Sequence, residues 1–161
     1  MLKLILMKKL VLAFGIISAT LYAGDLTADE SGMRQVILKF TMKPDGCPDE
    51  NMRPSPLIIH AYQLKAIKNF NKTDFVDMLE RDTNVLGDQL VNKQRLTHLT
   101  PGEVRGFRII LNKDTRYIGL FAEFSRYKNS KYKLVFPVVK NHPDVTTVNI
   151  QISGNRMDFL N

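Results

Sequence analysis

The sequence predicts an all-β protein, an antiparallel β-sandwich of two sheets with a small helical insert. Short segments of alternating or nearly continuous hydrophobicity recur along the chain, as expected of strands with at least one buried face. Turns rich in Pro, Gly, Asn and Asp separate these segments at spacings of about 8–12 residues, which is typical of sandwiches. One segment with helical periodicity, about residues 71–91, interrupts the series. About seven or eight strands are therefore expected, with one helical insert.

The 161 residues amount to about one domain. Residues 1–23 are excluded from it, because basic side chains precede an apolar run from Leu10 to Leu21 and a small-residue junction follows at Ala23. This pattern predicts a signal peptide that is removed on export or, if it is kept, a membrane anchor. Residues 24–32 are small and polar, as in a flexible tether, and residues 33–161 are expected to form the sandwich domain.

Charge and cysteine content narrow the classes of function. The formal net charge of +7 falls to +4 once the three lysines of residues 1–23 are removed, and the remaining basic residues are scattered. Nucleic acid is therefore not an expected partner. Cys47 is the only cysteine, so no internal disulfide is expected and stability must come from packing. No lipidation is expected, because Gly24 rather than a cysteine follows the predicted signal peptide.

The first strand is expected at residues 34–42, where apolar and polar side chains alternate up to a Pro-Asp-Gly turn. The loop that follows, from Lys43 to Pro56, is longer than the usual hairpin connection of about 2–5 residues. Two prolines, Pro54 and Pro56, restrict the backbone where this loop ends. Loops of this length in a compact domain often bind a partner.

The next strand, residues 57–64, is expected to be apolar on both faces. Leu57, Ile59 and Ala61 point one way, and Ile58, Tyr62 and Leu64 point the other. A strand with two apolar faces is expected in the interior of the molecule.

The remaining segments follow in order. Asn71 is expected to cap a helix over residues 73–81, and a second short helical turn follows around Gly87. The turn Thr100–Glu103 has Pro and Gly where a type II turn prefers them, so it is expected to join two strands in a hairpin. Strands are expected at residues 95–99, 104–111, 117–124, 132–139 and 145–152.

No stretch of the sequence matches a catalytic or cofactor motif. The histidines, His60, His98 and His142, are not spaced as metal ligands are. The acidic residues of the long loop lack the central glycine and the graded oxygen spacing of an EF-hand. Neither an activated nucleophile signature nor a phosphate-binding glycine loop occurs. We therefore expect no enzyme activity, no metal and no cofactor.

Several segments in order resemble one protein family. They are Arg53-Pro54-Ser55-Pro56 with Ile59–Leu64, Phe70 with Thr73-Asp74-Phe75, Leu99–Glu103, and Arg116–Phe124. In this order and at this spacing they are similar to the outer-membrane lipoproteins of the bacterial type VI secretion system, the TssJ or VasD type. The resemblance extends over about residues 34–152.

The resemblance implies a transthyretin-like sandwich of two sheets, without catalysis, in the periplasm at the outer membrane. Members of the family bind the periplasmic C-terminal region of the inner-membrane protein TssM, chiefly through the loop between the first two strands. Further copies of the protein are expected in the same membrane complex. Family members are normally anchored by a lipidated cysteine, and Gly24 stands at that position here. The protein is then held either by its partners or by an uncleaved N-terminal segment.

In this chain the corresponding loop runs from Lys43 to Pro56. Its candidate partner-binding residues are Asp45, Cys47, Asp49, Glu50, Asn51, Met52, Arg53 and Ser55. Met52 and Arg53 are the expected anchors, because Met and Arg are enriched in interfaces, whereas the neighbouring acids are expected at the rim. Lys128 is expected on the far side of the domain.

Two other classes of function are left open by the sequence. A periplasmic sandwich that binds a small molecule or a sugar would need a concave pocket of aromatic and polar side chains. A pilus-type subunit or chaperone would need an exposed edge strand that accepts another strand.

Overall fold

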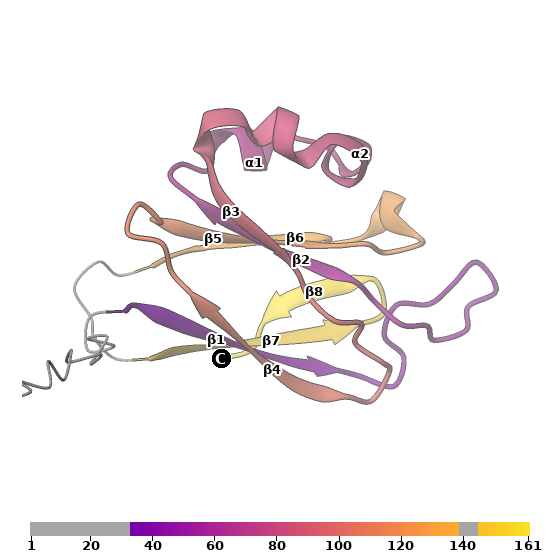
Figure 1. The fold of residues 1–161 in the computed structure, drawn as a ribbon. Coiled ribbons are helices and arrows are strands. Elements are labelled where there is room, and N and C mark those ends of the chain that lie inside the picture. The colour runs from indigo at the N-terminus through magenta and orange to yellow at the C-terminus, as the bar shows by residue number, and fades with distance from the viewer. Residues whose placement is uncertain (1–32, 139–144) are drawn as a thin grey trace, which may run out of the picture. The chain divides into compact units, whose positions relative to one another are not determined.

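The computed structural model describes residues 33–138 and 145–161, which form two sheets of four strands each, with helices over one sheet (Figure 1). One sheet has the order β4-β1-β7-β8, built from β1 (Gln35–Met42), β4 (Val104–Ile110), β7 (Thr146–Ser153) and β8 (Arg156–Phe159). The other has the order β3-β2-β5-β6, built from β2 (Ile59–Leu64), β3 (Leu90–Arg95), β5 (Tyr117–Ala122) and β6 (Lys133–Pro137). The helical elements are α1 (Lys68–Lys72), α2 (Phe75–Leu86), η3 (Gly87–Gln89) and η4 (Tyr127–Asn129).

The predicted sandwich with a helical insert is confirmed. The predicted signal peptide, the predicted tether and His142 lie outside the described residues. No helix among residues 33–138 and 145–161 is long and apolar enough to cross a membrane.

Strand β1 is central in its sheet, where it pairs antiparallel with β4 and parallel with β7. The parallel register runs from Val36 opposite Thr146 to Met42 opposite Ile152. The predicted antiparallel sandwich is therefore confirmed except for this pair, which is parallel. Alternating hydrophobicity reveals which face of a strand is buried, but it carries no information on the direction of the neighbouring strand.

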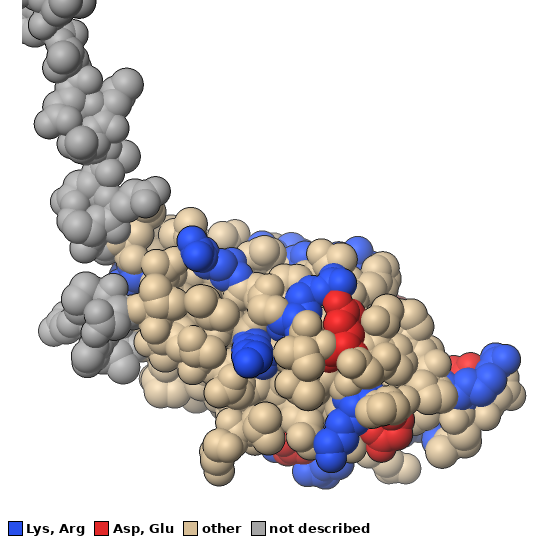
Figure 2. All heavy atoms as spheres, turned by 90° about the horizontal axis from the view of Figure 1, so that it is seen from below, with Lys and Arg blue, Asp and Glu red and all other residues tan. Residues whose placement is uncertain are grey.

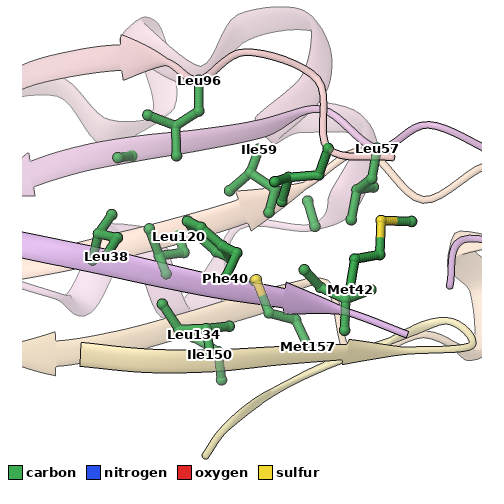
Figure 3. Packing of buried hydrophobic residues seen from close by; sticks show 14 of the residues in the cluster. Leu38, Phe40, Met42, Leu57, Ile59, Leu96, Leu120, Leu134, Ile150 and Met157 are labelled. Carbon is green, nitrogen blue, oxygen red and sulfur yellow. The ribbon is translucent and has the colours of Figure 1, made fainter. Parts of the chain in front are cut away.

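The main core lies between the two sheets. Alternate residues of β1, namely Val36, Leu38, Phe40 and Met42, are at most 2% exposed, so the predicted apolar face of this strand is confirmed. Figure 3 shows Leu38 and Phe40 pointing toward the other sheet, where Ile59 and Leu120 point back. Full burial of a side chain of this size contributes about 1.5–3 kcal/mol, so this core is the main source of stability.

The middle strands of the β3-β2-β5-β6 sheet, β2 and β5, are buried on both faces, because α1 and α2 cover the outer side of the sheet (Figure 1). Ile59 and Ala61 of β2 face the core between the sheets, whereas Tyr62 and Leu64 face the helices. The second core contains Tyr62, Leu64, Phe70, Phe75, Met78, Leu86 and Phe121. The two-sided pattern of residues 57–64 is explained by these two layers.

The helical insert differs from the prediction in its boundaries. Asp74, not Asn71, caps α2: its carboxylate accepts a hydrogen bond from the Asp77 amide at 2.9 Å. Element α2 extends to Leu86, but Arg81 inside it has non-helical backbone angles, φ −146° and ψ 37°, so a kink interrupts it at the predicted end. A separate short helix, α1, precedes it. The helix α1 lacks a side-chain cap, and Phe70 is its one buried residue. Its sequence therefore shows neither the capping residue nor the apolar periodicity from which a helix is predicted.

The prediction that the turn Thr100–Glu103 joins two paired strands in a hairpin is wrong. The type II turn itself is present, with Gly102 at φ 83° and the Glu103 amide bonded to the Thr100 carbonyl at 3.0 Å. However, β3 ends at Arg95 and belongs to one sheet, while β4 belongs to the other. Leu99 instead forms an isolated bridge with Leu57, so this segment crosses between the sheets.

The last strand, β8, was not predicted. Ser153 pairs with Arg156 across a tight turn in which Gly154 has φ 54°. A Gly-Asn pair after an alternating segment is a hairpin signal, so the sequence did contain the information.

Candidate partner-binding surface

The loop between β1 and β2, Lys43–Pro56, projects from one end of the sandwich (Figure 1). Its base is bonded to the β7–β8 hairpin, since the Lys43 amide donates to the Ile152 carbonyl at 2.8 Å and the Cys47 amide donates to the Gly154 carbonyl at 2.9 Å. The loop therefore starts from a fixed position on the folded body.

The two arms of the loop are bonded to each other. The Asp49 amide donates to the Arg53 carbonyl at 2.8 Å, and the Ser55 amide donates to the Cys47 carbonyl at 3.1 Å. The Ser55 hydroxyl donates to that same carbonyl at 2.6 Å. Between these contacts Pro48 and Pro54 form an isolated β-bridge. The loop is thus a narrow hairpin-like projection.

Asp49 organises the tip of the loop. Its carboxylate accepts hydrogen bonds from the Asn51 amide at 2.8 Å, from the Arg53 amide at 2.9 Å and from the Arg53 Nε at 3.0 Å. These contacts, the Arg53 amide first among them, lower the pKa of Asp49. Met52 adopts a left-handed backbone with φ 63°, which turns the chain at the tip. The tip is consequently ordered by its own contacts.

The candidate residues differ in exposure. Asp45, Glu50, Asn51, Met52 and Arg53 are exposed, while Asp49 and Ser55 are partly buried. Met52 is 64% exposed, which is high for a large apolar side chain. Cys47 is only 1% exposed, so its inclusion as a contact residue is corrected: its side chain supports the loop from inside.

Other residues share this end of the molecule. A hollow of about 390 Å³ lies between Glu50 on the loop, the segment Ser125–Asn129 and Asn155 of the β7–β8 turn. Arg126 also contacts the Met52 sulfur. The prediction that Lys128 lies on the far side of the domain is wrong, because it lines this hollow. The turn at Arg126–Ser130 was visible in the sequence, but its proximity to the loop depends on long-range strand pairing.

Among the described residues, the other candidate groups from the sequence form no second site. His60 Nε2 lies 2.5 Å from Glu123 Oε1, on the face of β2 that carries Tyr62, and His98 is exposed. Within residues 33–138 and 145–161 there is no group of three His, Cys, Asp or Glu side chains that could hold a metal ion. On the outer face of the β4-β1-β7-β8 sheet, basic and acidic side chains are mixed among uncharged ones (Figure 2).

The model of one protein family, described as type VI secretion lipoprotein, VasD, EvfM, TssJ, matches residues 34–155. The chain belongs to this family. The match extends from the start of β1 to the β7–β8 turn and so includes the whole loop Lys43–Pro56. The family resemblance seen in the sequence is thereby confirmed.

Solved structures show the same fold. The T6SS lipoprotein TssJ1 from Pseudomonas aeruginosa has a TM-score of 0.73 and 21% identity, over 80% of this chain and 95% of that one. A chain of a type VI membrane complex has a TM-score of 0.71 and 21% identity, over 80% and 99% of the two chains. A chain in a structure of the TssM C-terminal domain from EAEC has a TM-score of 0.66 and 19% identity, over 80% and 98%. No curated protein matches the chain.

Proposed function

We propose that this protein is a non-enzymatic structural component of a type VI secretion membrane complex and that it binds the periplasmic C-terminal region of a TssM-like protein through the loop Lys43–Pro56. In this proposal it acts on the periplasmic side of the outer membrane, alongside further copies of itself. The observation that carries the proposal is the internally bonded, exposed tip of this loop in a member of the type VI secretion lipoprotein family.

The order of the loop favours binding, because a loop that is already held in one conformation loses little entropy when a partner orders it. Here three contacts to the Asp49 carboxylate and the bonds between the two arms restrict the tip before any partner arrives. An unrestrained surface loop would gain no such advantage.

Met52 and Arg53 are the proposed anchors. The Met52 side chain is exposed at the tip, and Arg126 beside it extends the surface beyond the loop. The Arg53 side chain is 73% exposed although it pairs with Asp49 at 3.0 Å. Because a pair this exposed contributes little to stability, the loss of the Arg53 side chain should affect binding more than folding.

The test is calorimetry of the protein with the periplasmic domain of its TssM-like partner. We expect Arg53→Ala to weaken binding by about 1–2 kcal/mol, or about 5–30-fold, without lowering the melting temperature. Met52→Ala should have a similar effect. Replacing residues 46–51 with a Gly-Ser linker of equal length should weaken binding further, because it removes the Asp49 contacts as well.

Two matched controls lie at the opposite end of the sandwich. Met33 is also an exposed methionine, 45% exposed, and Lys113 follows β4 at the end where β1 begins. Met33→Ala and Lys113→Glu should leave partner binding unchanged. Loop variants that bind as tightly as the unmodified protein would remove this loop from the proposal, while leaving family membership untouched.

A further inference from the structure

The end of the sandwich opposite the Lys43–Pro56 loop carries a cluster of basic side chains, called here the basic end and consisting of Arg34, Lys65, Lys113 and Arg116. Lys65, Lys113 and Arg116 line a hollow of about 520 Å³ together with Ala66, Asp88, Gln89 and Asp114. Lys65, Lys113 and Arg116 are all exposed. Arg34 lies beside them, since its Nη2 bonds the Lys113 carbonyl at 3.2 Å.

These basic side chains form no ion pair within the described part of the chain. None of the ion pairs among residues 33–138 and 145–161 includes Arg34, Lys65, Lys113 or Arg116. At the loop end, by contrast, Arg53 pairs with Asp49 and Lys131 pairs with Asp158. With two acidic residues in the hollow, Asp88 and Asp114, the basic end keeps an excess of positive charge.

The backbone that presents these charges is held in place. The Arg34 guanidinium donates to the carbonyls of Asn112 at 2.9 Å, Lys113 at 3.2 Å and Thr115 at 3.3 Å. The buried Gln63 side chain accepts bonds from the Asn112 amide at 2.8 Å and the Thr115 hydroxyl at 2.7 Å. The loop between β4 and β5 is therefore fixed, and Lys113 and Arg116 leave it in a defined arrangement.

We propose that the basic end is a docking surface for the phosphate groups of an anionic lipid bilayer. The basic end combines several positive charges from separate loops, and no carboxylate of the described residues pairs with them. Such a surface attracts anionic headgroups with a free energy of about 1 kcal/mol per Lys or Arg. The position in the chain favours a membrane over a free anion. The described residues begin with Met33 at this same end, where β1 starts.

The distance from the apolar segment is short. Residues 22–32 separate Leu21 from Met33, and eleven residues span at most about 40 Å when fully extended. A membrane that holds the apolar segment would therefore lie within reach of the basic end. The opposite end, with the Lys43–Pro56 loop, would then point away from the lipid.

The experiment is co-sedimentation of the full chain with vesicles of phosphatidylcholine alone or of phosphatidylcholine mixed with phosphatidylglycerol. We expect tighter binding to the anionic vesicles, and loss of that preference in high salt, because surface charges are screened beyond about 3 Å at 1 M. Lys65→Gln with Lys113→Gln should weaken binding to the anionic vesicles by about 25-fold, about fivefold per side chain. Binding to neutral vesicles, which reports the apolar segment, should not change.

The matched control is Arg126→Gln with Lys128→Gln, which removes the same charge at the loop end. It should change binding to the anionic vesicles by less than about twofold. With the basic end on the membrane, the loop end lies farther from the lipid than the Debye length of about 8 Å, so its charges are screened. An equal effect of the two pairs would indicate attraction by net charge and overturn the proposal. Full competition by inorganic phosphate, at ionic strength matched with chloride, would overturn it in favour of a free-anion site.

Discussion

Cys47 lies at the base of the projecting loop with a left-handed backbone, φ 51°. Its sulfur is within 3.9 Å of the Pro56 carbonyl oxygen and 3.8 Å of the Ser55 hydroxyl. Burial raises the pKa of the Cys47 thiol, and the contact with Ser55 only partly opposes this shift. A thiol of this kind packs like a small apolar side chain and is poorly reactive.

We therefore expect the Cys47 thiol to react with iodoacetamide at least about tenfold more slowly in the folded protein than in denaturant. Burial limits access, and the raised pKa reduces the fraction of thiolate at a given pH. Mass spectrometry of the alkylated protein over time measures both rates. Equal rates would mean that the loop opens freely in solution, which would contradict the proposed pre-ordering of the binding surface.

At the scale of elements, the attachment of α1 depends on one lysine of β6. The Lys133 ammonium donates to the carbonyls of Phe70 at 2.8 Å, Asn71 at 3.1 Å and Thr73 at 2.6 Å. These carbonyls belong to the C-terminal end of α1, where the helix itself provides no partners. Desolvation lowers the pKa of Lys133, with Asp74 opposing the shift. A helix of five residues is not stable alone, so this contact and the burial of Phe70 keep it folded.

Lys133→Met should lower the free energy of unfolding by about 1.5–3 kcal/mol, the usual range for hydrogen bonds to a charged group. The apolar part of the side chain is preserved, so packing against Phe70 changes little. Hydrogen exchange should accelerate at the amides of α1 more than at those of the central strands.

Lys131→Met is the matched control two residues away. Lys131 pairs with Asp158 at 2.5 Å on an exposed part of the surface, so its loss should cost less than about 1 kcal/mol. Urea unfolding of both variants provides the comparison. Equal losses would show that Lys133 has no special role in attaching α1.

At the scale of the whole molecule, α2 is joined to the sandwich by apolar packing and by a polar cluster around Asp82. Asp82 of α2 accepts a hydrogen bond from the Tyr62 hydroxyl at 2.9 Å and lies 3.1 Å from the Lys93 ammonium. Partial burial opposes ionisation of Asp82, but hydrogen bonds from Lys93, Tyr62 and the Thr83 amide outweigh it and lower its pKa. The cluster therefore connects α2 with β2 and β3 only while Asp82 is ionised.

A lowered pKa in the folded state means that this stabilisation is complete above the ordinary aspartate pKa of about 3.9 and is lost as the pH falls through the lowered value. We expect Asp82→Asn to lower the free energy of unfolding by about 1 kcal/mol at pH 7, because the pair is partly exposed. At a pH below the lowered pKa of Asp82, the substitution should have almost no effect. Urea unfolding at both pH values tests this.

Asp77→Asn on the same helix is the control, because Asp77 pairs with Arg81 of α2 and not with the sheet. Its effect should stay below about 0.5 kcal/mol. A cost of Asp82→Asn that is independent of pH would show that the charge of Asp82 does not hold the helical layer.

Local patterns in the sequence determined much of the fold. Alternation identified the buried face of β1, and the two-sided apolar pattern of residues 57–64 anticipated a strand between two layers. The Pro and Gly residues located the turn Thr100–Glu103 and the stiff exit of the long loop. These features depend on residues near one another in the chain, whose conformational preferences are visible without the fold.

The tertiary structure decided which segments meet. The parallel pairing of β1 with β7, the separation of β3 and β4 into different sheets, and the burial of Cys47 all depend on contacts between distant parts of the chain. The same holds for the surface at the loop end, where Arg126 and Lys128 lie beside the loop rather than opposite it. Alternation along a strand predicts which of its faces is buried, but it does not identify the neighbouring segment, and a loop residue such as Cys47 has no such pattern. These contacts therefore follow only from the pairing of the strands in space.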